Sequence, residues 1–412
     1  MDLALNGGTP VRNRPYAPWP QYGEDEERAL LEVLHSREWG GYHPAIGELE
    51  ASFAAYHQVA HGVACVNGTV ALEVALRALG IGPGDEVIVT PYSFIASASA
   101  ILLCRATPVF ADIDPGSFNL SPAAAEAAIT PRTRAIIVVH FGGRPAEMDA
   151  FRSLAERHNL GLIEDAAHAH GARWQGIPVG GWGDAATFSF QSFKLMTAGE
   201  GGIILSRFPH IAERCWSYCN QGRNRGGGWF DHFSLGTNYR MTAFQAAVLN
   251  AQLRRIPGQT ETRAANVAYF REGLREIPGF VLPEEDPRIE QHPNYLLTLW
   301  YQPEAFSGAP REILVEALQA EGIPFRLPYP HPLYRNPLFL TEQNSLARAN
   351  WTAAQDYANL QLPVAERVCR EGVWLSHTVF LGEKRDVDDV LEALRKVQRM
   401  APALEAGMDG KR

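Results

Sequence analysis

Short apolar runs alternate with helix-like stretches between about residue 63 and residue 206. The pattern predicts strands at 86–90, 107–112, 135–140, 161–164, 186–190 and 202–205. Several runs, such as 136–139 (IIVV), are apolar at every position rather than at every second one, so both faces of the sheet should be buried. Strands that alternate with helices in this way are typical of a mostly parallel sheet covered by helices.

The helical patterns divide the chain into a larger and a smaller part. Residues 67–69 (NGT) begin a helical pattern that ends near residue 79, where glycines and a proline follow. A longer helical region is expected from about 242 to 277, and short strands and helices follow among proline-rich loops at 324–337. We therefore predict a large domain over 1–260, which includes an N-terminal segment, and a small C-terminal α+β domain over 261–412.

Composition and charge narrow the class of protein. A chain of 412 residues with 46% hydrophobic positions can bury a large core, which excludes disordered and fibrous classes. The net charge of −9 gives no electrostatic signature for nucleic acid or an anionic membrane. The first 14 residues lack the apolar core of a signal peptide, and no stretch approaches the ~20 apolar residues of a membrane span. We expect a cytoplasmic protein.

The cysteines do not suggest a metal site. There are five, an odd number, and only two of them stand four residues apart, without histidines to complete a zinc site. We expect mostly buried, reduced thiols at Cys65, Cys104, Cys215, Cys219 and Cys369.

A carboxylate lies at the end of one predicted strand. In 162–171 (LIEDAAHAHG) an apolar strand ends at Asp165 and then turns through small residues. Ligands of open α/β sheets bind at the carboxyl ends of strands. From these residues alone, Asp165 fits a helix cap as well as a ligand-binding carboxylate.

A lysine follows a later strand, in 188–202 (FSFQSFKLMTAGEGG). A single lysine is usually a solvated surface charge. A lysine placed in a desolvated site near the strand end at Asp165, however, would have a lowered pKa and become a nucleophile. Lys194 is therefore a candidate for a Schiff-base lysine.

The predicted helix start at Gly68 and Thr69 offers a second kind of chemistry. Backbone N–H groups, a hydroxyl and the positive end of the helix dipole together suit a phosphate group. An ordinary capping turn has the same residues, so both interpretations stay open.

Together these motifs resemble the fold-type-I pyridoxal-phosphate enzymes, and within them the DegT-type sugar and cyclitol aminotransferases. The similarity extends from 6–10 (NGGTP) to 374–377 (WLSH) and is most specific at 164–172 (EDAAHAHGA) and at 187–202. The resemblance implies an aspartate-aminotransferase-like α/β fold, a pyridoxal 5'-phosphate cofactor and aminotransferase activity.

The resemblance also implies roles for single residues. Lys194 would carry the cofactor and shuttle a proton, and Asp165 would pair with the protonated pyridine nitrogen, which makes the ring an electron sink. His168 would lie beside the phenolic oxygen of the cofactor, and Phe94 would stack on its ring. The alternatives are a buried histidine bonded to backbone and a plain core phenylalanine.

The remaining implied contacts involve the phosphate. Ser189 would join Gly68 and Thr69 there, and the residue matching Asn238, in 236–241 (GTNYRM), reaches the phosphate of the neighbouring subunit in relatives. The resemblance therefore implies a homodimer with shared active sites.

Only the similarity of short segments to one branch of the family indicates the substrate. Residues 172–176 (ARWQG), the segment 191–200 and 374–377 (WLSH) look more like the branch of inosose aminotransferases and 3-amino-5-hydroxybenzoate synthases than like the nucleotide-sugar branch. We expect transfer from glutamine or glutamate to a keto group of an inosose-like cyclitol, in sugar, cyclitol or antibiotic biosynthesis. His377 and 39–42 (WGGY) could line a compact polyol pocket.

Three alternatives remain open at this level. The acceptor could be a nucleotide-linked keto-sugar whose diphosphate binds Arg223 and Arg225. The enzyme could be similar to 3-amino-5-hydroxybenzoate synthase in its reaction. The chain could also be a non-enzymatic regulator of the same fold.

Overall fold

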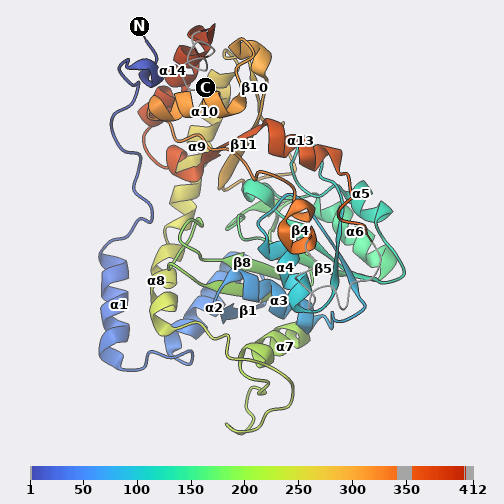
Figure 1. Ribbon diagram of the computed structural model, residues 1–412. Coiled ribbons are helices and arrows are strands. Elements are labelled where there is room, and N and C mark those ends of the chain that lie inside the picture. The colour runs from blue at the N-terminus through green and yellow to red at the C-terminus, as the bar shows by residue number, and fades with distance from the viewer. Residues whose placement is uncertain (1, 341–354, 403, 405–412) are drawn as a thin grey trace.

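The computed structural model describes residues 2–340, 355–402 and 404. Figure 1 shows a lower part built around a large sheet and an upper part around a small one, with the N-terminal segment running from beside α14 down to α1. The helices are α1 (Glu24–Ser36), α2 (Pro44–Tyr56), α3 (Gly68–Ala78), α4 (Ala96–Leu103), α5 (Pro122–Ala127), α6 (Met148–His158), α7 (Pro209–Cys219), α8 (Ala243–Leu253), α9 (Ile256–Leu274), α10 (Arg311–Ala320), α11 (Pro337–Leu340), α13 (Pro363–Glu371) and α14 (Lys384–Arg399).

Within the described residues, the large sheet has seven strands in the order β1-β9-β8-β5-β4-β2-β3. Its strands are β1 (His61–Cys65), β2 (Glu86–Val89), β3 (Thr107–Phe110), β4 (Thr133–Val139), β5 (Gly161–Asp165), β8 (Ala185–Ser189) and β9 (Gly202–Ser206). The pairs from β3 through β8 are parallel, whereas β9 is antiparallel to both β8 and β1. The mostly parallel sheet and its six predicted strands are confirmed.

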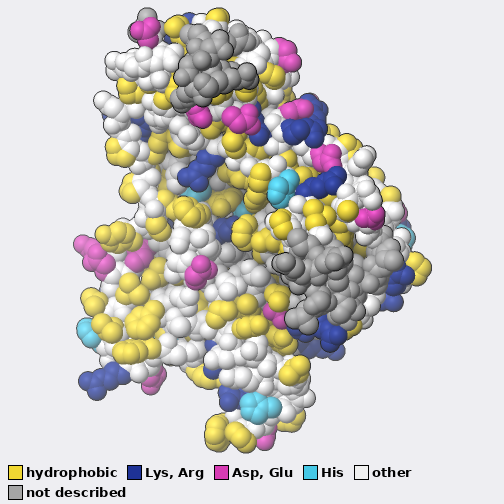
Figure 2. Space-filling model, viewed as in Figure 1, with side chains coloured by type: hydrophobic (Ala, Val, Ile, Leu, Met, Phe, Trp, Pro, Cys, Tyr) yellow, Lys and Arg dark blue, Asp and Glu magenta, His cyan; other side chains and the backbone are white. Residues whose placement is uncertain are grey.

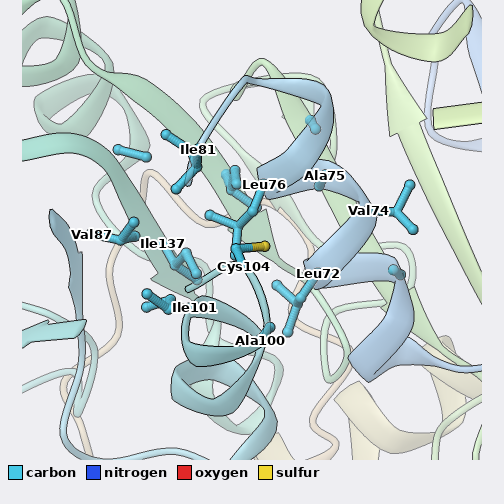
Figure 3. Close-up of a cluster of buried hydrophobic side chains, with 14 of the residues drawn as sticks. Leu72, Val74, Ala75, Leu76, Ile81, Val87, Ala100, Ile101, Cys104 and Ile137 are labelled. Carbon is cyan, nitrogen blue, oxygen red and sulfur yellow. The ribbon is translucent and has the colours of Figure 1, made fainter. Parts of the chain in front are cut away.

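Strand β1 was not predicted, because 61–65 (HGVAC) has only three apolar residues beside a histidine and a glycine. The expected burial of both sheet faces is confirmed, since every position of β2, β3, β8 and β9 is buried. Figure 3 shows Leu72 and Leu76 of α3 gathered with Ile101 of α4 near Val87 and Ile137 of the sheet. This packing fixes α3, whose first turn belongs to the site described below.

The region predicted as helical from 242 to 277 is two helices rather than one. α8 ends at Leu253 and α9 begins at Ile256. The break precedes Pro257, which lacks an N–H and fits only the first turn of a helix. Helices thus cover most of the predicted region, and the structure adds the break between them.

The upper part contains a three-stranded antiparallel sheet in the order β10-β11-β12 among the described residues. Its strands are β10 (Phe280–Val281), β11 (Leu296–Tyr301) and β12 (Gly372–Ser376), and the short pair β6 (Arg173–Trp174) and β7 (Ile177–Pro178) lies in the lower part. Leu3 belongs to the upper hydrophobic cluster, and Arg12 pairs with Asp386 of α14 at 2.8 Å. The start of the chain thus packs against its C-terminal region, and the domain boundary at 260 stays a prediction.

All five cysteines are buried and free of disulfides. In the described part of the chain, no helix has both the length and the apolar character needed to cross a membrane.

Candidate active site

Lys194 and Asp165 meet at the carboxyl ends of two neighbouring strands. β5 pairs with β8, and Lys194 lies in the turn that follows β8. The backbone N–H of Lys194 donates to Gln191 O at 2.8 Å. Burial lowers the pKa of Lys194 to about 8, and the nearby charge of Asp165 opposes this change. The structure therefore gives Lys194 the enclosed position that a nucleophilic amine requires.

Asp165 is buried and held by two hydrogen bonds. Ser97 Oγ donates to Asp165 Oδ2 at 2.7 Å, and the N–H of Ala167 donates to Oδ1 at 3.3 Å. Burial raises the pKa of Asp165, whereas Ser97, Ala167 and the charge of Lys194 act to lower it. The pKa of Asp165 is raised overall, and these three neighbours limit the rise.

The adjacent carboxylate, Glu164, faces the other side of the sheet because side chains alternate along a strand. It accepts hydrogen bonds from the N–H groups of Gly180, Trp182 and Gly183 at 2.8–2.9 Å, and it lies 3.2 Å from His140 Nε2. Glu164 therefore fixes the turn before β8, and Asp165 is the residue of this pair that faces Lys194.

His168 lies beside Lys194 in a stack of rings. Its ring is 4.3 Å from that of Tyr295 at an angle of 26°, and Lys194 Nζ lies 5.0 Å from the centroid of the Tyr295 ring. Burial, with the charge of Lys194, keeps the pKa of His168 well below its usual value, so its ring is neutral. His168 Nδ1 is buried and has no hydrogen-bond partner in the described structure.

The first turn of α3 forms a cradle with Ser189. A Cβ on Gly68 would lie 2.7 Å from Ser189 Cβ, and one on Gly202 would lie 2.9 Å from Gly68 N. Asn67 caps the helix by accepting from Val70 N at 2.9 Å, so the N–H groups of Gly68 and Thr69 are left for another acceptor. Gly68, Thr69 and Ser189, predicted to bind one phosphate, are thus brought together.

The residues present fit pyridoxal 5'-phosphate. The cradle can accept a phosphate, and the buried carboxylate of Asp165, the unpartnered nitrogen of His168 and the amine of Lys194 supply the polar groups that a pyridoxal ring requires. Figure 2 shows basic and histidine side chains in a hollow between the upper and lower parts.

Phe94 and Asn238 are exposed in the isolated chain. Phe94 is 59% exposed and lies in the turn that leads to Ser97, which places it on the Asp165 side of the site. Asn238 precedes Tyr239, whose carbonyl accepts from the N–H of Val66 next to the cradle. Both positions leave the predicted roles open.

The predicted pocket residues are not gathered in one place. His377 is buried, stacks on Tyr295 at 5.7 Å and meets the edge of Trp19 at 4.6 Å. Trp39 packs on Phe244, and Tyr42 contacts Arg240 and Arg223. His377 therefore belongs to the ring stack, whereas 39–42 packs against a different part of the chain.

Two residues of the site, Ser97 and Tyr295, were missed in the sequence. Ser97 lies among small residues in 96–100 (ASASA), which carry no chemical signal. Tyr295 follows Pro293-Asn294 and precedes the apolar run 296–301 (LLTLWY). That turn before a strand was the available signal, but nothing local links it to Lys194.

Comparisons with known proteins agree with this geometry. Residues 20–395 match the DegT/DnrJ/EryC1/StrS aminotransferase family. A protein of Streptoalloteichus tenebrarius with the provisional name L-glutamine:3-amino-2,3-dideoxy-scyllo-inosose aminotransferase is 41% identical, over 98% of this chain and 99% of its own. A second protein of that organism, named L-glutamine:2-deoxy-scyllo-inosose aminotransferase, is 38% identical over 98% and 100%.

A solved structure is also similar over most of its length. The crystal structure of 3-amino-5-hydroxybenzoic acid synthase superposes with a TM-score of 0.83 at 33% identity, over 94% of this chain and 99% of that one. The predicted family, fold class and cofactor class are confirmed, and the chain is an enzyme rather than a regulator without activity.

Proposed function

The chain belongs to the DegT/DnrJ/EryC1/StrS aminotransferase family, and we therefore propose that it transfers the amino group of glutamine to the ketone of an inosose-like cyclitol. The observation that carries this proposal is the enclosed amine of Lys194 beside Asp165 and His168, in a chain that matches named inosose aminotransferases over nearly its whole length.

When bound, pyridoxal 5'-phosphate supplies the electron sink that allows a proton to be removed from the carbon bearing the amino group. Lys194 would hold the cofactor covalently, and Asp165 would keep a proton on the pyridine nitrogen through its supported negative charge. His168 would donate to the phenolic oxygen from a neutral ring, and Phe94 would cover the pyridine face. Gly68, Thr69 and Ser189 would bind the phosphate.

Lys194 would also move the proton. A pKa of about 8 leaves roughly a tenth of the free amine neutral at pH 7, which is enough for it to accept a proton from carbon. The same amine, once protonated, can return the proton at a neighbouring atom. A fully solvated lysine would be charged almost completely and could not act as this base.

The acceptor is better matched to a free polyol than to a nucleotide sugar. Arg223 donates to Tyr42 Oη at 3.1 Å, and Arg225 lies 3.5 Å from Glu213. Arg225 therefore has a carboxylate partner in its own chain, whereas the side-chain bond of Arg223 is to the neutral Tyr42 hydroxyl and its Nε has no partner in the described structure. The names of the relatives support glutamine as donor and a deoxy-scyllo-inosose-type acceptor.

The functional unit would be a homodimer in the cytoplasm. Asn238 is exposed, so its amide is accessible to a second copy docked on this face, as the family resemblance implies. The loop before it exposes several apolar side chains, at Trp229, Phe230, Phe233 and Leu235, which is the composition of an interface.

The acceptor is tested by single-turnover kinetics. Glutamine should first convert the bound cofactor to its amine form, which changes the absorbance. Adding 2-deoxy-scyllo-inosose should then restore the aldehyde absorbance much faster than an equal concentration of a dTDP-linked 4-keto-sugar. A clear preference for the nucleotide sugar would overturn the cyclitol assignment, and Arg223→Ala should in that case raise its KM.

A further inference from the structure

A short segment before β11 is built to present one ring to the site. Asn294 has a left-handed backbone (φ 51) that most residues avoid. It is held there by two bonds to His292, because its N–H donates to His292 Nδ1 at 2.9 Å and its side-chain amide donates to His292 O at 2.8 Å. This turn directs the next residue, Tyr295, toward Lys194.

The segment is also fixed from two other sides. The fully buried Arg263 donates from Nε to Pro293 O at 2.7 Å. Gly143 lets the backbone approach closely, since a Cβ there would lie 2.8 Å from His168 O and 3.3 Å from Tyr295 N. Any larger residue at Gly143 would push Tyr295 away from His168.

The ring of Tyr295 cannot easily turn away. It lies between the rings of His168, at 4.3 Å, and His377, at 5.7 Å. Burial raises the pKa of Tyr295 to about 12, and burial lowers the pKa of His377 to about 3. All three rings are therefore uncharged, and Lys194 Nζ lies 5.0 Å from the Tyr295 centroid, within the range of a cation–π contact.

We propose that Tyr295 is a positioning residue for Lys194, whose free ammonium it holds over the face of its ring whenever that amine is not attached to the cofactor. This inference rests on the proposed role of Lys194. Among the described residues, the titratable groups that act on Lys194 or are acted on by it are Asp165 of β5, His168 and His170 of the following turn, and Tyr295. Both histidines are neutral, so only Asp165 and the Tyr295 ring favour the charged amine.

The proposed contact has a defined consequence for the reaction. Burial favours loss of the proton from Lys194, whereas the ring face stabilises the ammonium. Tyr295 thus keeps the amine both near the site and able to carry a proton after it has taken one. Removing the ring should lower kcat, because the proton-carrying form of Lys194 would lose the stabilisation that the ring face provides.

The test measures the pKa of Lys194 directly. The chain has only four lysines, at 194, 384, 396 and 411, so each can be followed by mass spectrometry. The full-length holoenzyme is converted with glutamine to the amine form, in which the lysine is free, and treated with trace acetic anhydride over a series of pH values. The midpoint of acetylation against pH gives the pKa, with Lys384 as the internal reference, since its own ring partner Tyr269 is unchanged in every variant.

Three variants distinguish the effects of the ring, of the hydroxyl and of packing on the pKa of Lys194. Tyr295→Leu should lower the pKa of Lys194 by about half to one pH unit, and Tyr295→Phe should leave it unchanged. Tyr301→Leu, at the far end of the strand that follows Tyr295, removes a buried tyrosine bonded to Ala309 O and should not change the pKa of Lys194. Should the leucine variant fail to fold, pentafluorophenylalanine can replace the tyrosine at position 295. It keeps the ring shape but removes the negative charge density from the ring face, so it should lower the pKa of Lys194 in the same way.

The proposal is wrong if Tyr295→Leu or the fluorinated ring leaves the acetylation midpoint in place, or if Tyr301→Leu shifts it equally. These outcomes are separate from a failure of the proposed function. A cofactor attached to another lysine would refute the role of Lys194 without changing the effect of Tyr295 on its pKa.

Discussion

Ser97 donates its hydroxyl hydrogen to Oδ2 of Asp165 at 2.7 Å, inside a site where both side chains are buried. A second hydroxyl, that of Ser93, lies 2.9 Å from Ser97 Oγ and extends the chain of hydrogen bonds. Burial raises the pKa of Asp165, and the Ser97 bond is the foremost of the contacts that counteract it. A neutral Asp165 could not hold a proton on the pyridine nitrogen, so Ser97 supports the charge on which the proposed chemistry depends.

Removing this hydroxyl should therefore change the pH dependence of the reaction. Ser97→Ala leaves Asp165 without its main donor, so the pKa of the carboxyl should rise and activity on the acid side should be lost at a higher pH. The measurement is kcat against pH from 5.5 to 9. Ser97→Thr keeps a hydroxyl and should restore the profile, and an unshifted acid limb in Ser97→Ala would show that the bond is only structural.

Asp165→Asn should keep bound cofactor but lose most of the activity. A neutral amide fills the same space and retains the bond with Ser97, but it cannot stabilise a charged pyridine nitrogen. We expect kcat to fall at least about 100-fold, equivalent to about 2.7 kcal/mol of transition-state stabilisation. Cofactor content from absorbance and kcat from glutamine turnover give the comparison. Activity within a fewfold of wild type would remove Asp165 from the mechanism.

The enclosed amine of Lys194 should destabilise the cofactor-free protein at neutral pH. The pKa of Lys194 is near 8 in the folded chain and 10.5 as the reference value, so between these values the unfolded chain binds more protons and stability rises with pH. Below pH 8 the amine is charged in both the folded and the unfolded chain, so the free-energy cost of enclosing that charge is fully present. Lys194→Met should then raise the free energy of unfolding by about 1–3 kcal/mol at pH 7 and by much less at pH 10.5.

Denaturant unfolding of the cofactor-free protein at the two pH values checks this expectation. Lys384→Met, at an exposed position beside the Tyr269 ring, is the control and should not raise the free energy of unfolding at pH 7. An equal gain at pH 7 and pH 10.5 for Lys194→Met would mean that packing, and not charge, explains the effect.

The predicted dimer is tested by mixing inactive variants. If Asn238 acts across the interface, Lys194→Ala mixed with Asn238→Ala places both lesions in one site of each mixed dimer. Activity should then recover toward about a quarter of wild type, since half of the dimers are mixed and each has one intact site. Lys194→Ala mixed with Asp165→Asn should not recover, because both residues serve their own chain. Absence of recovery in the first mixture, with subunit exchange verified, would confine Asn238 to its own subunit.

The sequence predicted the parts of the site that lie at the ends of neighbouring strands. Asp165 and Lys194 follow apolar runs whose buried pattern is local, and the pairing of β5 with β8 brings them together. The cradle was predictable for the same reason, since Gly68 and Thr69 begin a helix after a capping Asn67. These features depend on local patterns and on the general geometry of parallel sheets.

The remainder depends on contacts between distant segments. Tyr295 reaches Lys194 only because Arg263, Gly143 and Asn294 fix its segment, and no local pattern reveals that combination. β1 was missed because its own segment has few apolar residues and its partner, β9, follows far along the chain. The break between α8 and α9 lies just before Pro257, inside the region predicted as helical.

The identity of the reacting lysine is the central claim, and borohydride treatment of the holoenzyme tests it most directly. Reduction converts the C=N bond between an aldehyde cofactor and a lysine into a stable amine, and mass spectrometry then locates the cofactor among the four lysines of the chain. We predict that the added mass lies on Lys194 and that Lys194→Ala is unmodified and inactive. Label on Lys384, Lys396 or Lys411, or turnover by Lys194→Ala, would contradict the account.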